Sequence, residues 1–326
     1  MRRHLSALVV LVAMSLPAGA QNLYPERPVI MVVPFSAGGP LDIVARLVAE
    51  SMSRDLGQNV LVENVPGAGG TIGAARVAKA KPDGYTLLMY HIGLATSPAL
   101  YKERLRFDPR SDLRPIGLVN EVAMVLVSRP GLDVENLQGL ISRLNTNADQ
   151  IRIGHAGVGS ASHLCTLLMA TAAKNGQLNP IPYRGTGPAM TDLLGGHIDV
   201  ICDLVTSAAS VIEAKRVNVL AVTANARLAG MAGVPTTAEA GVSGLEMMNW
   251  NALLVPASTP DPIAGKLSSA LGNALVDSKV IEKLRELGSV PIDQERSTPA
   301  VLAQHLAAEI ARWSPIIEAA GARGQQ

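Results

Sequence analysis

The sequence has few cysteines, few aromatic side chains and no long apolar run after its first twenty residues. Only 3% of its 326 residues are aromatic, whereas sugar and aromatic-ligand sites usually draw on stacking rings. Its formal net charge is +1 and its Lys and Arg residues do not cluster, which argues against a nucleic-acid partner. Gly, Pro or charge interrupts each later apolar run well before the ~20 residues of a membrane span. A small polar or anionic ligand suits this composition best.

The N-terminal segment 1–20 is typical of a cleaved secretory signal peptide. Arg2 and Arg3 precede an apolar stretch over residues 5–16, and Ala18-Gly19-Ala20 forms a small-x-small cleavage pattern. The stretch is too short to cross a bilayer. We therefore expect export to the periplasm and a mature chain that begins at Gln21. Its length predicts two domains.

The two cysteines, Cys165 and Cys202, belong to apolar segments that are far apart in the sequence. We expect two buried structural cysteines, because each segment faces a core. An exported protein is permitted a disulfide, but spacing alone cannot establish the pairing geometry.

Short apolar runs alternate with helix-period segments along the chain. Continuous apolar runs fit strands that are buried on both faces. The βαβα order predicts parallel sheets covered by helices. The expected strands cover residues 29–33, 60–62, 86–89, 122–127, 198–202 and 217–222, and the expected helices begin at Pro40 and Pro188 and cover 262–276, 280–287 and 299–313.

A strand, a glycine-rich loop and a helix start follow one another four times. In parallel α/β sheets such loops lie at the carboxyl ends of the strands, where ligands bind. Backbone N–H groups and helix dipoles attract anions there, and glycine allows close approach. One such loop could be only a turn. Four loops, divided between the two halves of the chain, predict two groups of binding loops that face each other, which we call the first and second jaws. The four loops span residues 34–39, 66–70, 157–160 and 183–187.

These loops and the polar side chains at strand ends supply the candidate ligand-binding residues. His91 and His155 could each read a polar group of the ligand, although lone histidines are more often structural. Asp42 and Asp203 could bond to their own loops or contact a ligand ammonium. Arg184 could pair with a carboxylate or remain solvated. The full set is Phe35, Ser36, Ala37, Gly38, Gly39, Asp42, Gly67, Ala68, Gly69, Gly70, His91, Gly157, Gly159, Ser160, His163, Tyr183, Arg184, Gly185, Thr186 and Asp203.

Motifs of other protein classes are incomplete. Glycines 67–73 follow G-x-G-x-x-x-G, one residue off the dinucleotide fingerprint, with no acidic ribose partner about twenty residues on. Ser160 and His163 could share one helix face, but the sequence has no G-x-S-x-G elbow and no H-E-x-x-H motif. Ser160 fits a helix N-cap better. We expect no catalytic residue, no metal site and no cofactor, and a periplasmic hydrolase remains an alternative.

A set of motifs along the whole mature chain resembles the substrate-binding proteins of tripartite tricarboxylate transporters, also called the Bug family. The motifs are Tyr24-Pro25-Glu26-Arg27-Pro28, Pro34-Phe35-Ser36-Ala37-Gly38-Gly39 with Asp42 and Ala45-Arg46, Val62-Glu63-Asn64-Val65-Pro66-Gly67-Ala68-Gly69-Gly70, Pro82-Asp83-Gly84-Tyr85-Thr86-Leu87-Leu88, Gly157-Val158-Gly159-Ser160 with His163-Leu164, Tyr183-Arg184-Gly185-Thr186, Asp192-Leu193-Leu194-Gly195-Gly196, and Pro235-Thr236 with Glu239-Ala240-Gly241.

The resemblance implies a two-lobed α/β periplasmic binding protein type II fold. Each lobe would be a mostly parallel sheet flanked by helices, and two crossover strands near residues 122–127 and 247–253 would join the lobes. Residues 21–122 and 247–326 would form lobe 1, and residues 123–246 would form lobe 2, with the ligand cleft between them.

The resemblance also implies a ligand and partners. Loops 34–39 and 66–70 would hold a ligand carboxylate through main-chain groups and water, and loops 157–160 and 183–186 would close over it. Family ligands are dicarboxylates, tricarboxylates, amino acids and aromatic acids, handed to membrane permease subunits by a monomer. His91, His155 and Arg184 depart from the usual pattern, which leaves the ligand's identity open. A sensing subunit for a membrane receptor is a further alternative.

Overall fold

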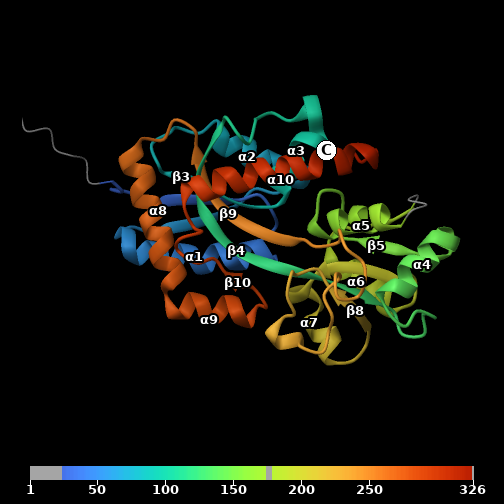
Figure 1. Cartoon of the computed structure of the whole chain (residues 1–326). Coiled ribbons are helices and arrows are strands. Elements are labelled where there is room, and N and C mark those ends of the chain that lie inside the picture. Colours follow the sequence, from blue (N-terminus) through green and yellow to red (C-terminus); the bar gives the residue numbers. More distant parts are fainter. Residues whose placement is uncertain (1–23, 174–177, 325–326) are drawn as a thin grey trace, which may run out of the picture.

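The computed structural model describes residues 24–173 and 178–324, which form a two-part α/β molecule (Figure 1). The predicted signal peptide lies outside the described residues. Figure 1 shows the N-terminal and C-terminal segments together on one side and the middle of the chain on the other. No helix within residues 24–173 and 178–324 is both long and apolar enough to cross a membrane.

The first part is built on three parallel strands in the order β2-β1-β3. The strands are β1 (Val29–Val33), β2 (Val60–Asn64) and β3 (Thr86–His91), and they are followed by α1 (Pro40–Leu56), α2 (Thr71–Ala78) and α3 (Gly93–Tyr101). Helix α1 buries Leu41, Val44 and Val48, the apolar stripe that predicted it, and has proline in its first turn. The predicted βαβα order is therefore confirmed here.

Two long strands connect this part to the second. Strand β4 (Leu113–Ser128) pairs with β9 (Met248–Pro256) over its first two thirds and with β7 and β8 over its last residues. At about 3.3 Å per residue it extends ~50 Å. The sequence predicted only residues 122–127 of this strand, because Pro115 and Gly117 interrupt the apolar pattern.

The second part contains the middle of the chain. Its strands β7, β5 and β6 are parallel to one another, and β7 and β8 are antiparallel to β4. Its elements are α4 (Leu137–Asn147), β5 (Ile153–His155), α5 (Ala161–Ala172), β6 (Ile181–Pro182), α6 (Thr186–Leu194), β7 (Val200–Leu204), α7 (Val205–Glu213) and β8 (Asn218–Val222).

The C-terminal segment returns to the first part and contains the predicted tail helices. It forms α8 (Asp261–Val276), α9 (Ser278–Glu286), β10 (Val290–Pro291) and α10 (Pro299–Ala319). Thr298 caps α10 by accepting a hydrogen bond from Val301 N, as its sequence position predicted. Helix α10 packs on α3 and β4 and also contacts α5 of the second part. Short 3-10 turns cover Ala68–Gly70, Lys102–Arg104, Ala148–Gln150 and Ala229–Met231.

Candidate functional site

The strand directions make the carboxyl ends of the two sheets face each other. Strand β3 is antiparallel to β9, and β9 is antiparallel to β4, so β3 and β4 run the same way. Strand β7 runs against β4 and therefore points back toward the end of β3. Strands β1 and β2 are parallel to β3, and β5 and β6 are parallel to β7. All six strands therefore end toward the boundary between the two parts.

The register shows how close these ends are along the crossover strands. His91, the last residue of β3, is level with Asn251 of β9, which is level with Asn120 of β4. Met124, four residues further along β4, is level with Leu204 at the end of β7. Four residues of strand span ~13 Å. We call the loops at these ends the facing loops: 34–39, 66–70, 91–93, 157–160, 183–186 and 203–205.

Asp42 supports loop 34–39 through three hydrogen bonds. Its carboxylate accepts hydrogen bonds from Gly38 N, Arg46 Nε and Asn64 Nδ2, all at 2.9 Å. Burial alone would raise the pKa of Asp42, but these bonds outweigh burial and leave the pKa below its usual value. Of the two roles considered from the sequence, the structure shows the bond to its own loop. The N–H groups of Ser36 and Ala37 make no hydrogen bond with other described residues.

Loop 66–70 packs tightly on Tyr90 and Tyr101, which are not among the predicted ligand-binding residues. Tyr90 Oη donates a hydrogen bond to Gly69 O at 2.7 Å. A Cβ at Gly69 would lie 2.5 Å from Tyr101 Oη, and one at Gly70 would lie 2.6 Å from Tyr90 Oη. Both glycines have positive φ, 62° and 97°. Only glycine fits these two positions, so the loop's backbone is held in one shape.

His91 ends β3 and stacks on Phe35 of the neighbouring loop, with ring centroids 4.5 Å apart. Its Nδ1 accepts a hydrogen bond from Gly93 N at 2.8 Å. Burial lowers the pKa of His91 to about 4, so the ring is neutral at pH 7.

Loop 157–160 is shaped by two buried histidines. His155 Nδ1 accepts from Gly157 N at 3.2 Å, and His163 Nδ1 accepts from Gly159 N at 3.3 Å. The two rings lie 4.7 Å apart between centroids. Burial lowers the pKa of both, that of His163 to about 3. The Gly157 and Gly159 amides are therefore used inside the protein.

Ser160 is the N-cap of α5, as its position predicted. Its Oγ donates to Gly157 O at 2.7 Å and accepts from His163 N at 3.1 Å. The His163 ring bonds Gly159 instead of the hydroxyl, so no serine–histidine nucleophile forms in this arrangement. Among the described residues, no group of three or more His, Cys, Asp or Glu side chains could hold a metal ion.

The remaining predicted residues lie at the ends of β6 and β7. Tyr183 Oη donates to Asp192 at 2.7 Å, and Arg184 is exposed. Asp203 is buried, and its Oδ2 has no hydrogen-bond partner among the described residues. Burial raises the pKa of Asp203 to about 6, against the opposing effects of Thr186 and of the Leu204 N–H.

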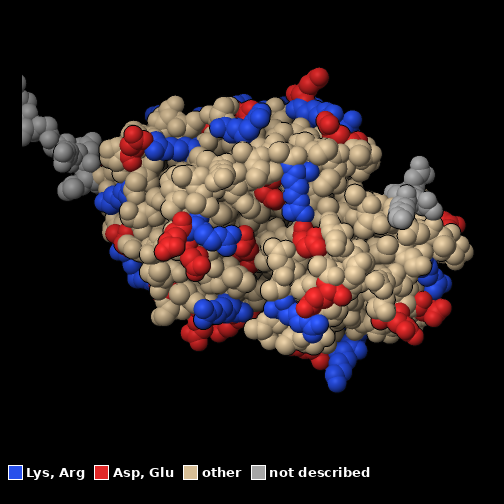
Figure 2. All heavy atoms as spheres, viewed as in Figure 1, with Lys and Arg blue, Asp and Glu red and all other residues tan. Residues whose placement is uncertain are grey.

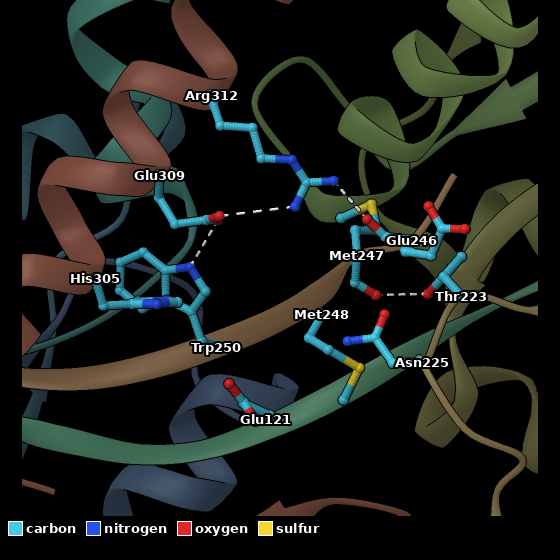
Figure 3. A pocket seen from close by; sticks show the side chains of 10 residues that line it. All are labelled: Glu121, Thr223, Asn225, Glu246, Met247, Met248, Trp250, His305, Glu309 and Arg312. Carbon is cyan, nitrogen blue, oxygen red and sulfur yellow. Dashed lines mark hydrogen bonds and ion pairs between the residues drawn. The ribbon is translucent and has the colours of Figure 1, made fainter. Parts of the chain in front are cut away.

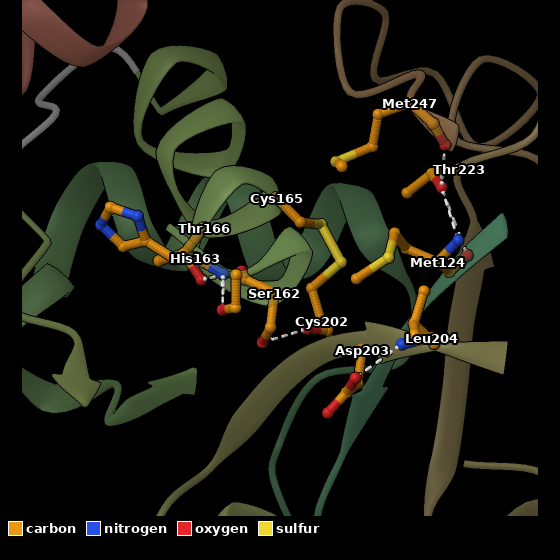
Figure 4. The surroundings of a disulfide bond; sticks show 11 residues. Met124, Ser162, His163, Cys165, Thr166, Cys202, Asp203, Leu204, Thr223 and Met247 are labelled. Carbon is orange, nitrogen blue, oxygen red and sulfur yellow. Dashed lines mark hydrogen bonds between the residues drawn. A yellow bond between two sulfur atoms is a disulfide. The ribbon is translucent and has the colours of Figure 1, made fainter. Parts of the chain in front are cut away.

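Cys165 and Cys202 form a disulfide, so the prediction of two unpaired structural cysteines was wrong (Figure 4). The fold brings α5 onto β7 and places the two Cα atoms 6.1 Å apart. Next to the bond, Ser162 Oγ donates to Cys202 O at 2.5 Å. The start of α5, which follows loop 157–160, is thereby fixed to strand β7, which contains Asp203.

A cavity of about 280 Å³ lies elsewhere, beside crossover strand β9 (Figure 3). Within it, Glu309 of α10 accepts from Trp250 Nε1 at 3.1 Å, and Arg312 donates to the Glu246 backbone oxygen. None of the predicted ligand-binding residues lines this cavity. Its lining is Glu121, Thr223, Asn225, Glu246, Met247, Met248, Trp250, His305, Glu309 and Arg312.

The crossover strands also carry buried polar side chains that sequence reasoning missed. Asn251 Nδ2 donates to Asn120 Oδ1 at 2.9 Å, and Asn120 Nδ2 donates to Ser289 Oγ at 2.6 Å. The asparagines at 249 and 251, within an apolar run, were the available signal. On the face seen in Figure 2, acidic and basic side chains are interspersed, without a patch of one sign.

Comparisons with known proteins agree on one family. Residues 44–322 match the tripartite tricarboxylate transporter family receptor. A protein from the TAR-I ttuE-ttuC' intergenic region of Agrobacterium vitis is 48% identical over 96% of this chain and 90% of its own. Among solved structures, the periplasmic binding protein BugD is 41% identical with a TM-score of 0.81, covering 93% of this chain and 100% of its own. MatC from Rhodopseudomonas palustris, solved with bound malate, is 37% identical with a TM-score of 0.81, covering 90% and 100%.

These likenesses confirm the α/β periplasmic binding protein fold. The chain belongs to the tripartite tricarboxylate transporter receptor family, a family of solute-binding receptors that are not enzymes.

Proposed function

We propose that this receptor captures a small dicarboxylate between the facing loops and delivers it to the membrane permease subunits of its transporter. The observation that carries the proposal is the convergence of six strand ends from two sheets on one boundary. Ligands of open α/β sheets bind at such carboxyl ends. MatC, which shares this fold, was solved with malate, a dicarboxylate.

The first jaw suits a carboxylate because it offers amide donors that bond no other described residue. Ser36 N and Ala37 N precede the N-terminus of α1, where the helix dipole also favours an anion. Loop 66–70 adds a rigid glycine backbone held by Tyr90 and Tyr101. A ligand that touches both jaws would select the closed form, as in other hinge-closing binding proteins.

We propose separate roles for three parts of the chain. Residues 1–20 direct export to the periplasm, residues 21–122 and 247–326 form lobe 1, and residues 123–246 form lobe 2. The mature protein works as a monomer. Mass spectrometry of the protein recovered from periplasm, with an N-terminus at Gln21, and light scattering at the monomer mass would support these statements.

Two matched glycine variants test the site. Gly69→Val places a branched side chain against Tyr101 in loop 66–70, whereas Gly57→Val adds the same strain at φ 69° with open space around it, at the far end of α1. We expect Gly69→Val to lose dicarboxylate binding by calorimetry and Gly57→Val to keep it. Equal affinity in both variants, with both folded by circular dichroism, would contradict the placement of the site.

A further inference from the structure

Three histidines in or next to the facing loops share one arrangement, in which Nδ1 accepts a hydrogen bond from a glycine N–H. The pairs are His91 with Gly93, His155 with Gly157, and His163 with Gly159. A neutral imidazole has one acceptor nitrogen and one donor nitrogen. Since Nδ1 accepts, the proton must lie on Nε2. Each ring therefore has an Nε2–H donor.

The Nε2–H donors of His155 and His163 belong to two adjacent, buried rings. Their rings lie 4.7 Å apart, and their exposed fractions are only 2% and 5%. Neither Nε2 bonds another described residue, and neither is among the fully buried polar atoms that lack a partner. The small exposed remainder of each ring therefore includes Nε2. Figure 4 shows the His163 ring extending from α5 away from the disulfide.

The two ring donors lie beside a loop in which the Gly157 and Gly159 amides already bond within the protein. Loop 157–160 belongs to the second jaw, where a Cβ at Gly159 would lie 3.3 Å from Leu100 of α3 in the first part. The Gly157 and Gly159 amides bond the histidines and cannot bond a ligand as well. The second jaw therefore offers the two ring donors in addition to Arg184, which is exposed, and Asp203, which is buried.

We propose that the Nε2–H groups of His155 and His163 together bind the second carboxylate of the ligand and so select dicarboxylates over monocarboxylates. Two donors on adjacent rings match the two oxygens of one carboxylate. The inference rests on the proposed function, because it assumes that the first carboxylate is held by loops 34–39 and 66–70. It makes His155 and His163 specificity-determining residues.

Two substitutions of His155 separate this role from a structural one. In His155→Asn, Oδ1 can still accept from Gly157 N, but no donor reaches the Nε2 position. In His155→Gln, a donor is near that position, but the Gly157 bond is lost. Succinate and adipate are the dicarboxylate probes, and butyrate and hexanoate are the matched monocarboxylates.

We expect wild type to prefer the dicarboxylates, and His155→Asn to weaken dicarboxylate binding by about tenfold to hundredfold while monocarboxylate binding stays unchanged. His155→Gln should retain part of the preference. Nitrogen-15 NMR should show both rings as the neutral Nε2–H tautomer. An unchanged preference in His155→Asn, or an Nδ1–H tautomer, would overturn the inference but leave the proposed function intact. Failure of wild type to bind any of the probes would instead count against the proposed function.

Discussion

Removing the Cys165–Cys202 disulfide should destabilise the protein by an amount that the loop length sets. The bond joins residues 37 positions apart. In the chain-entropy model, closing a loop of that size lowers the entropy of the unfolded chain and so raises its free energy by about 4 kcal/mol at 25 °C. With an unfolding entropy near 2.1 cal/mol/K per residue, this corresponds to a fall in Tm of about 6 °C for a protein of this length.

Differential scanning calorimetry with and without reductant measures this effect. The Cys165→Ala/Cys202→Ala variant is the control, because its Tm should be low already and should not respond to reductant. Alanine is preferred to serine because both positions are fully buried and a hydroxyl would lack a partner. Two free thiols in the native wild type, with a Tm that reductant does not change, would refute the reasoning.

Two carboxylates give further predictions. Asp42→Ala should lower the free energy of unfolding in urea by about 2–3 kcal/mol, since three hydrogen bonds to a carboxylate are lost; a change below 0.5 kcal/mol would contradict its bracing role. The pKa of Asp203 is raised to about 6 in the folded protein, so the folded protein binds this proton more tightly than the unfolded chain does. Protonated Asp203 therefore stabilises the fold fully below about pH 4, and this stabilisation is lost as the pH rises through 6. In the ligand-free protein, the free energy of unfolding should fall by ~3 kcal/mol over this pH range, and Asp203→Asn should abolish that fall.

The sequence predicted the parts of the fold that depend on local pattern. Strand β1, helix α1 and the three tail helices follow from apolar periodicity and from proline and threonine at helix starts. Four of the facing loops, at 34–39, 66–70, 157–160 and 183–186, could also be predicted, because glycine-rich turns after parallel strands must gather at the carboxyl ends.

What the sequence did not predict depends on contacts between distant segments. The first half of β4 contains Pro115 and Gly117, and it is a strand because β9 pairs with it across two irregularities in register. The disulfide exists because α5 packs on β7, which spacing cannot reveal. The histidine bonds to Gly157 and Gly159 arise from the turn geometry of one loop.

The central claim is that the facing loops bind a small dicarboxylate. The most direct measurement is isothermal titration calorimetry of the protein from Gln21 onward, unfolded and refolded to remove co-purified ligand, against malate, succinate and adipate. We expect one-to-one binding of at least one dicarboxylate, lost in Gly69→Val and kept in Gly57→Val. Binding of none of them by folded protein, or binding that Gly69→Val leaves unchanged, would contradict it.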